Sequence, residues 1–90
     1  MANLSWKPDF AVPPGLTLQE TIDAQGIDQP ELAVRSGLSA KEINQIIEGV
    51  APITHDIAIR LEHATGVPAR MWNNLEANYQ EQRARLADPV

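Results

Sequence analysis

The fold is decided by the stretch from Gln29 to Ile47, which reads QPELAVRSGLSAKEINQII. Apolar residues recur at helical spacing on both sides of a glycine, which predicts two short helices joined by a tight turn. Gly37 is placed at the turn, because a corner of this kind needs a positive φ that glycine adopts without steric cost. Ala33 lies where two closely crossing helices leave room for a small side chain only.

The remaining apolar residues of this stretch are spaced so that they face one core. The residues expected to face inward are Leu32, Ala33, Ser36, Leu38, Ile43, Ile46 and Ile47. This pattern is typical of a helix-turn-helix, whose second helix lies in the major groove of DNA. The alternative is an ordinary helical hairpin that uses the same corner.

Cap and stop signals predict five helices and no strand, so the fold class is all-α. The expected N-caps are Thr17 with Glu20 as reciprocal partner, Asp28 with Glu31, Ser39 with Glu42, and Thr54. The expected helix ends are Gly26, Gly37, Gly49 and Gly66. Pro68 opens the fifth helix, which runs to about Leu86.

The 90 residues form one small domain with a proline-rich start. We divide the chain into an irregular arm at 1–15, a folded domain at 16–86 and a tail at 87–90. Trp6, Phe10 and Val12 either pin the arm onto the domain or leave it partly disordered. A domain of this size gains stability from self-association, because it buries a modest fraction of its surface alone.

Composition limits the classes of function. The chain has no cysteine and a formal net charge of −5. We therefore expect no disulfide framework and no thiol nucleophile, which suits a reducing compartment. The first ten residues lack the charged and apolar blocks of a signal peptide, and no apolar run approaches the roughly 18 residues of a membrane span. These features predict a cytoplasmic protein that does not enter the membrane.

The second helix of the helix-turn-helix carries the candidate DNA-reading residues. Lys41, Asn44 and Gln45 are expected on one exposed face, at spacings of three and four residues. Asparagine and glutamine can bond bidentately to adenine, and lysine can bond guanine or phosphate. Ala40 in the first turn is placed to touch a thymine methyl group. The alternative for each residue is a solvated polar surface.

Three further residues are candidate anchors for the DNA backbone. Gln29 at the start of the first helix of the turn can reach a phosphate, helped by the helix N-terminus. Ser39 and Thr54, at the starts of the next two helices, are the other two. The charge of this region argues against DNA binding, because residues 28–50 hold two basic and four acidic side chains and DNA is negatively charged. Part of this acidity has a structural reason, because carboxylates favour helix N-termini.

An enzyme is not indicated. His55 and His63 lie eight residues apart, so they do not form the i, i+4 pair of a metal site, and no carboxylate cluster completes one. No nucleophile lies beside a base, and no glycine-rich loop cradles a phosphate. We therefore predict no catalytic residue, no metal, no cofactor and no small-molecule substrate.

The last helix carries apolar residues along one side. Trp72 is expected to pack into the core, and Leu75 lies on the same side of the helix. Tyr79 and Leu86 lie further along, where the helix is expected to extend beyond the folded domain. An apolar stripe there needs cover, which a two-fold partner supplies. A homodimer is also what a helix-turn-helix protein needs to read two half-sites.

Several segments together resemble the HigA (VapI-type) antitoxins, a branch of the XRE, or lambda-repressor-like, helix-turn-helix family. The segments that carry the resemblance are Val12-Pro13-Pro14-Gly15, Gln29-x-Glu31-Leu32-Ala33, Gly37-Leu38-Ser39, Ile46-Ile47-x-Gly49, Pro52-Ile53-Thr54 and Trp72-x-Asn74-Leu75-x-Ala77-x-Tyr79. They cover roughly residues 12–82, which is nearly the whole chain.

The resemblance implies a five-helix repressor fold with the helix-turn-helix at the second and third helices. It implies a dimer that binds a palindromic operator and represses its own operon. It also implies a protein partner, a RelE/HigB-like ribonuclease toxin that the antitoxin neutralises. By position, the reading helix is 40–48, in agreement with the assignment made from the residues.

The chain departs from the family pattern just after the reading helix. Many relatives are basic there, whereas this chain has Val50 and Ala51. Two alternatives therefore stand beside the antitoxin. One is a protein-interaction module on the repressor fold with weak DNA binding, and the other is an XRE-type regulator without a toxin.

Overall fold

The structure is a computed structural model that describes residues 11–88. Within this range the chain forms five helices and no strand: α1 (Pro14–Gln25), α2 (Gln29–Ser36), α3 (Ala40–Ile47), α4 (His55–Thr65) and α5 (Ala69–Ala87). The all-α, five-helix prediction is confirmed, with the helix-turn-helix at α2 and α3. Trp6 and Phe10 lie outside the described residues, as do residues 89–90 of the tail predicted at 87–90.

Three of the predicted caps are present. Asp28 accepts from the Glu31 amide at 2.9 Å, and Thr54 Oγ1 accepts from the Ile57 amide at 3.2 Å. Ser39 and Glu42 form the complete capping box, with each side chain bonded to the other's backbone N–H. These caps follow from bonds that span three residues, which is why the sequence alone predicts them.

The cap of the first helix was predicted wrongly. The helix begins at Pro14 with Pro13 as its N-cap, so Thr17 lies inside it and makes no cap bond. The carbonyl oxygen of Thr17 instead accepts from the Thr21 hydroxyl at 2.7 Å. Proline is favoured in the first turn, because its φ is already helical and the N–H it lacks has no partner there. The first helix therefore includes the last two residues of the predicted arm.

The predicted reciprocal bond of Glu31 is also wrong. Its carboxylate pairs with Arg35 one turn later, at 2.7 Å, and does not reach back to Asp28. Such i, i+4 pairs stabilise a helix by a few tenths of a kcal/mol. The cap of α2 therefore rests on the Asp28 side chain alone.

Gly15 determines how closely α1 and α3 approach. It is buried inside α1, and a Cβ built on it would lie 2.1 Å from the carbonyl oxygen of Ile46 and 2.5 Å from Cα of Ile47. Any side chain at this position would push the C-terminal end of α3 away from α1. The sequence had placed Gly15 in the irregular arm and gave no sign of this contact.

One core joins all five helices. Its largest fully buried side chains are Leu18, Ile22, Leu32, Ile43, Ile46, Leu61 and Trp72. Burying a side chain of this kind stabilises a fold by about 1.5–3 kcal/mol. Trp72 is 0% exposed and anchors the start of α5, so its predicted role in the core is confirmed.

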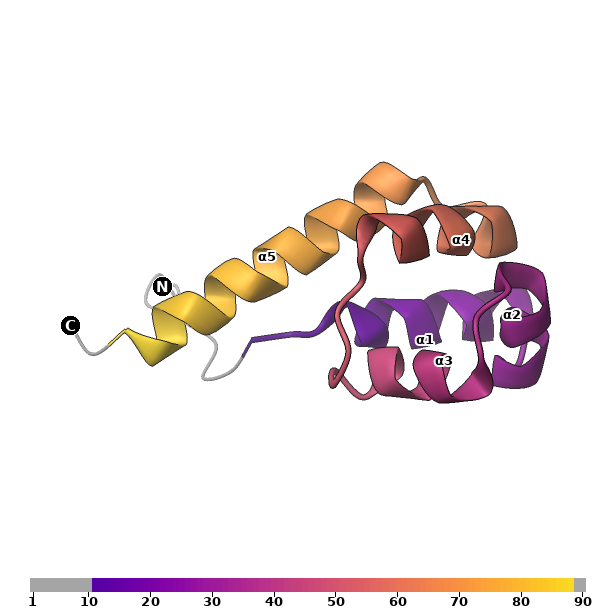
Figure 1. Ribbon diagram of the computed structural model, residues 1–90, viewed down its shortest axis with the longest axis horizontal. Coiled ribbons are helices and arrows are strands. Elements are labelled where there is room, and N and C mark those ends of the chain that lie inside the picture. The colour runs from indigo at the N-terminus through magenta and orange to yellow at the C-terminus, as the bar shows by residue number, and fades with distance from the viewer. Residues whose placement is uncertain (1–10, 89–90) are drawn as a thin grey trace, which may run out of the picture.

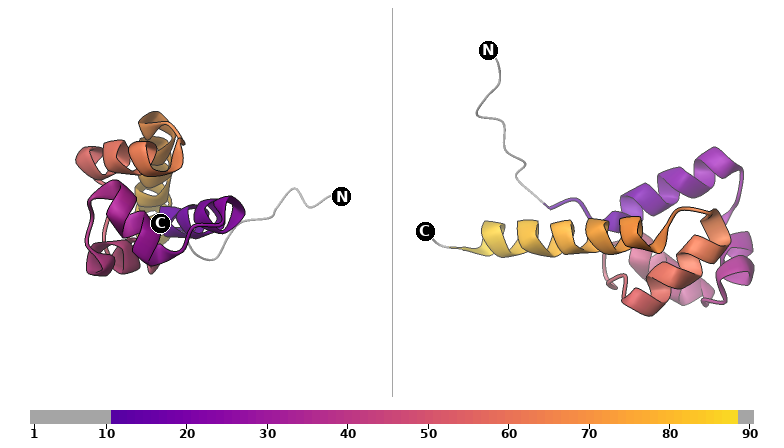
Figure 2. Two further views of the ribbon diagram at one scale, coloured as in Figure 1. Left: turned by 90° about the vertical axis from the view of Figure 1, so that its right-hand side faces the viewer. Right: turned by 90° about the horizontal axis from the view of Figure 1, so that it is seen from above.

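The far half of α5 leaves the other helices (Figures 1 and 2). The radius of gyration is 14.4 Å, against about 12 Å expected for a compact chain of this length. Burial declines along the helix, from Trp72 through a half-buried Tyr79 to Leu86, which is 50% exposed. The prediction that this helix extends beyond the folded domain is confirmed.

Candidate nucleic-acid interface

The outer face of α3 presents polar side chains that make no hydrogen bond or ion pair within residues 11–88. Lys41 and Asn44 are exposed, and neither side chain makes a hydrogen bond or ion pair with any residue in 11–88. Ala40 is exposed in the same first turn. Ile43 and Ile46, on the opposite side, are buried and fix the rotation of the helix about its axis. The side chains of Lys41 and Asn44 therefore point away from the core, on a face of α3 that the buried isoleucines determine.

Gln45 differs from the other two predicted reading residues. Its side chain is half-buried, so it lies at the edge of the exposed face. Its backbone carbonyl accepts from the amides of Val50 at 2.8 Å and Ala51 at 3.1 Å. Gln45 thus also holds the loop that follows the reading helix.

The three predicted backbone anchors keep donors that can reach outward. Ser39 and Thr54 accept a bond from the helix they cap, which leaves each hydroxyl proton free to donate. The Gln29 amide nitrogen donates to Gln19 Oε1 of α1 at 3.2 Å and is half-buried. One of its two amide hydrogens remains for a further partner.

The reading helix carries a carboxylate in its first turn. The backbone N–H and the hydroxyl of Ser39 lower the pKa of Glu42, and Arg60 adds a smaller contribution. Glu42 is therefore ionised at neutral pH. Its charge is directed to the Ser39 amide at 2.9 Å, where it stabilises the start of α3.

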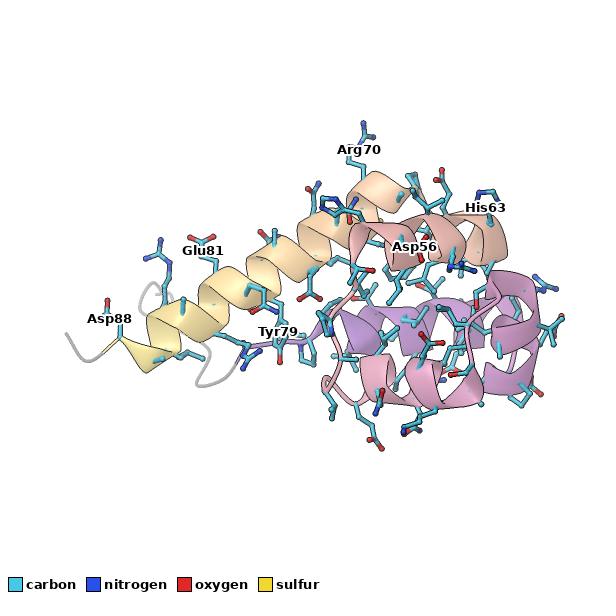
Figure 3. The ribbon with its side chains drawn as sticks, in the orientation of Figure 1. Asp56, His63, Arg70, Tyr79, Glu81 and Asp88 are labelled. Carbon is cyan, nitrogen blue, oxygen red and sulfur yellow. The ribbon has the colours of Figure 1, made fainter. Side chains whose placement is uncertain are left out.

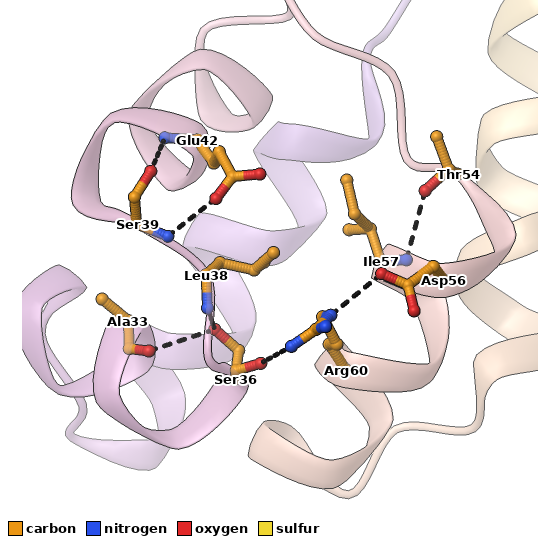
Figure 4. A network of polar contacts seen from close by, with 9 residues as sticks. All are labelled: Ala33, Ser36, Leu38, Ser39, Glu42, Thr54, Asp56, Ile57 and Arg60. Atoms are coloured by element: carbon orange, nitrogen blue, oxygen red, sulfur yellow. Dashed lines mark hydrogen bonds and ion pairs between the residues drawn. The ribbon is translucent and has the colours of Figure 1, made fainter.

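Arg60 of α4 joins the turn of the helix-turn-helix to the neighbouring helix (Figure 4). Its Nη1 donates to the Ser36 carbonyl at 3.3 Å, and its Nε donates to Asp56 at 2.9 Å. Asp56 raises the pKa of Arg60. Sequence reasoning missed this residue, although the Asp56-x-x-x-Arg60 spacing signals the intrahelical half of the network.

Gly37 meets two requirements at the corner. Its φ is +75°, and a Cβ there would lie 2.8 Å from Nη1 of Arg60. A larger residue would therefore strain the backbone and also displace the arginine that bonds Ser36. The prediction of a glycine-dependent turn is confirmed, and Arg60 supplies a second reason for it.

The loop after α3 presents an apolar residue next to the reading helix. Val50 is 70% exposed, although its amide is bonded to Gln45. It follows Gly49, whose φ is +78° and whose added Cβ would lie 3.2 Å from Cβ of Pro13 and 3.8 Å from the Tyr79 hydroxyl. The loop therefore packs against the segment before α1 and against α5.

The two predicted dimerisation residues lie on α5. Tyr79 lies on the side of α5 that faces the start of α1, whereas Glu81 points away on the opposite side (Figure 3). The Arg83 guanidinium lies 5.4 Å from the centroid of the Tyr79 ring. Leu86, two residues before Asp88, is exposed. Tyr79 thus contributes to intramolecular packing, and Leu86 is the more available of the two.

The arm is tied to α5 by its backbone. The Val12 amide donates to Gln82 Oε1 at 3.3 Å, while the Val12 side chain is 41% exposed. At Val12 the arm is therefore held by a backbone hydrogen bond, whereas the sequence suggested an apolar contact as one of two alternatives.

Residues 11–88 contain neither a candidate metal site nor a helix that could span a membrane. Within this range no group of three histidine, aspartate or glutamate side chains is arranged to hold a metal ion, and His55 and His63 are both exposed. In the same range no helix is long and apolar enough to cross a membrane.

Comparison with known proteins connects this geometry to a family. A helix-turn-helix family profile matches residues 18–72. A Nostoc punctiforme structure, assigned as an antidote protein of a plasmid maintenance system, shares 33% identity over 84% of each chain, with a TM-score of 0.78. A search of curated protein sequences gives no significant match.

Two structures from Pseudomonas aeruginosa include DNA. The antitoxin HigA, solved with the higBA promoter, is 31% identical over 86% of this chain and 85% of its own, with a TM-score of 0.79. A protein in complex with its 28-bp operator DNA is 29% identical over 86% of each chain, with a TM-score of 0.80. The profile match and these identities show that the chain belongs to the XRE-type helix-turn-helix family, in its HigA antitoxin branch.

Proposed function

We propose that this protein binds operator DNA as a dimer and represses its own operon as the antitoxin of a type II toxin–antitoxin module. The observation that carries the proposal is the outer face of α3, where Lys41 and Asn44 have no partner in residues 11–88. The likeness to a HigA solved with promoter DNA supports it.

Each residue of the interface has a proposed part. Lys41, Asn44 and Gln45 contact base edges, and Ala40 contacts a thymine methyl group. Gln29, Ser39 and Thr54 donate to phosphates and set the register of the protein on the duplex. The half-buried position of Gln45 confines it to the edge of the groove.

The dimer is proposed to form through the extended half of α5. Leu86 is exposed on a segment that no other helix within residues 11–88 covers, and Tyr79 lies nearer the folded domain. Two copies of α3 can read half-sites one helical turn apart only if the two-fold contact places them about 34–36 Å apart. Repression of a palindromic operator depends on this spacing.

The second partner is proposed to be a RelE/HigB-like ribonuclease. The net charge of −5 opposes DNA binding but matches a basic protein, because complementary charge steers association. Neutralisation can be tested by co-expressing the product of an adjacent gene for a small basic protein. Rescue of growth by this chain is expected, and a lack of rescue would leave a regulator without a toxin.

Operator binding is tested by fluorescence anisotropy with the DNA immediately upstream of the gene, at two salt concentrations. Asn44→Ala is expected to lose about 1–3 kcal/mol of specific binding, and Lys41→Ala to reduce the salt slope by about 1 if Lys41 contacts phosphate. Asn74→Ala and Arg70→Ala, at exposed positions of α5, are the matched controls. Equal effects of the α3 and α5 variants would contradict the assignment of the reading helix.

A second candidate function rests on the charge of the interface. Val50 and Ala51 stand where relatives are expected to be basic, and Glu42 is ionised in the reading helix. A protein-interaction module with this surface would bind any DNA with Kd of about 10⁻⁴–10⁻⁶ M at physiological salt. Nanomolar, sequence-specific binding would exclude it.

A further inference from the structure

A shallow depression lies between the C-terminal end of α2 and the second half of α4. Its apolar part is formed by Val34 and Ile59, and its polar part by Arg35, Arg60 and His63. Val34 is 84% exposed and Ile59 is 50% exposed. Val34 is the most exposed of the large apolar residues described, so the core makes almost no use of it.

The ionisable residues that line the depression are all basic, in a chain with net charge −5. Two carboxylates on the same helices orient the arginines: Glu31 bonds Arg35 at 2.7 Å, and Asp56 bonds Arg60 at 2.9 Å. Each arginine makes its ion pair through one nitrogen, so further N–H donors remain on both. Exposed pairs of this kind contribute little, and a carboxylate arriving from outside can share the same arginine.

The geometry of the depression is fixed by the turn of the helix-turn-helix. Arg60 reaches across to the Ser36 carbonyl at 3.3 Å and lies against Gly37, which has no side chain to displace it. The Arg60 guanidinium is therefore held next to the apolar surface. A site in which few side chains must be ordered on binding loses less free energy to conformational entropy.

The depression lies away from the proposed DNA and dimer surfaces. His63 lies at the end of α4, above α2 and on the side opposite to α3 (Figure 3). The extended half of α5 leaves the molecule at the other end (Figure 1). An occupant of the depression would therefore leave both α3 and α5 accessible.

We propose that this depression is a docking surface for a protein partner that presents an apolar side chain flanked by carboxylates. The apolar side chain covers Val34 and Ile59, and the carboxylates bond Arg35, Arg60 and His63. Charge complementarity selects this partner: the ionisable side chains that line the depression are all basic, and both arginines keep unused N–H donors, although the whole chain is acidic. Docking there is compatible with operator binding, so the partner can join the DNA-bound protein.

The test is an NMR titration of the full chain with two synthetic helical peptides, one built from leucine and glutamate and the other from leucine and lysine. Net charge alone favours the lysine peptide. The proposal expects the glutamate peptide to bind more tightly and to shift the amide signals of residues 34–37 and 59–63. Equal binding, tighter binding of the lysine peptide, or shifts confined to other residues would overturn it.

Val34→Asp is expected to weaken binding of the glutamate peptide by about tenfold or more, as for the loss of a central interface residue. Met71→Asp is the matched control, since Met71 is 51% exposed on α5 and does not line the depression. An unchanged Kd for Val34→Asp would overturn the proposal. Operator affinity is measured on the same variants and is expected to stay unchanged, so failure of the docking surface is separable from failure of DNA binding.

Discussion

The backbone of Gly15 in α1 lies directly against the Ile46 carbonyl of α3, so closely that a Cβ on Gly15 would be 2.1 Å from that oxygen. This contact sets the position of the reading helix relative to the rest of the core. Its neighbour Ile46 is 1% exposed and cannot move aside without opening the core. The proximity of these two residues leads to the first prediction.

Gly15→Ala is expected to destabilise the protein by about 1–3 kcal/mol, as overpacking of a close contact does. The sign of the change in unfolding free energy is diagnostic. At a helix position without close neighbours, a glycine-to-alanine change usually stabilises the protein by about 0.4–1 kcal/mol. Urea unfolding followed by circular dichroism measures the difference. Gly26→Ala is the comparison, since position 26 has φ +71° and no atom within 4 Å, and so reports backbone strain without a clash. A stabilised Gly15→Ala would show that α3 can shift at no cost.

The sequence predicted three of the four N-caps, although it misplaced the start of the first helix and the partner of Glu31. The caps at Asp28, Ser39 and Thr54 were predictable because each is closed by an amide three residues away. The close approach at Gly15 was not, because it depends on where α3 lies after folding. The same holds for the Arg60–Ser36 bond, which joins residues 24 positions apart.

The candidate site was predictable to the same extent. The periodicity of α3 placed Lys41 and Asn44 outside and Ile43 inside, as the structure has them. It did not reveal that Gln45 is half-buried, because the loop that folds back onto its carbonyl has no periodic pattern. The pairing of Val34 with Ile59 in one depression depends on the crossing of α2 and α4, which no spacing in the sequence specifies.

Val50→Arg is expected to tighten operator binding and to steepen its salt dependence. Val50 is 70% exposed beside the reading helix and adds no charge there. One new phosphate contact raises the magnitude of the slope of log Kobs against log salt by about 0.9. Anisotropy titrations at several salt concentrations measure it, with Val50→Gln as the uncharged control. An unchanged slope would show that the loop does not face the DNA backbone.

Glu42 is expected to make stability depend on pH in the acidic range. Its pKa is lower in the folded than in the unfolded protein, because the backbone N–H and the hydroxyl of Ser39 stabilise the carboxylate. The folded state thus binds fewer protons than the unfolded state between the two pKa values. The stabilisation is complete above the unfolded pKa of about 4.3 and is lost as the pH falls through the folded pKa.

Thermal unfolding between pH 6 and pH 3 measures this effect. In Glu42→Gln the melting temperature is expected to fall less between pH 6 and pH 3 than in the wild type, because the glutamine amide does not titrate. Glu62→Gln is the control, because the exposed Glu62 side chain makes no hydrogen bond within residues 11–88. Identical pH profiles for the wild type and Glu42→Gln would show that the capping box does not discriminate between the charged and neutral carboxyl.

Leu86→Asp is expected to weaken the proposed dimer by about tenfold or more, because it places a charge in the centre of an apolar contact. Leu86 is 50% exposed on the extended half of α5, so the substitution has no core contact to disrupt and the monomer should stay folded. Sedimentation equilibrium of the wild type, Leu86→Asp and the control Met71→Asp gives the three dissociation constants. Operator affinity should fall in the variant whose dimer is weaker, because a monomer binds one half-site and loses the cooperative advantage of binding two. If Leu86→Asp dimerises as tightly as the wild type, the two-fold contact lies elsewhere, and the spacing of the two reading helices must be derived from another surface.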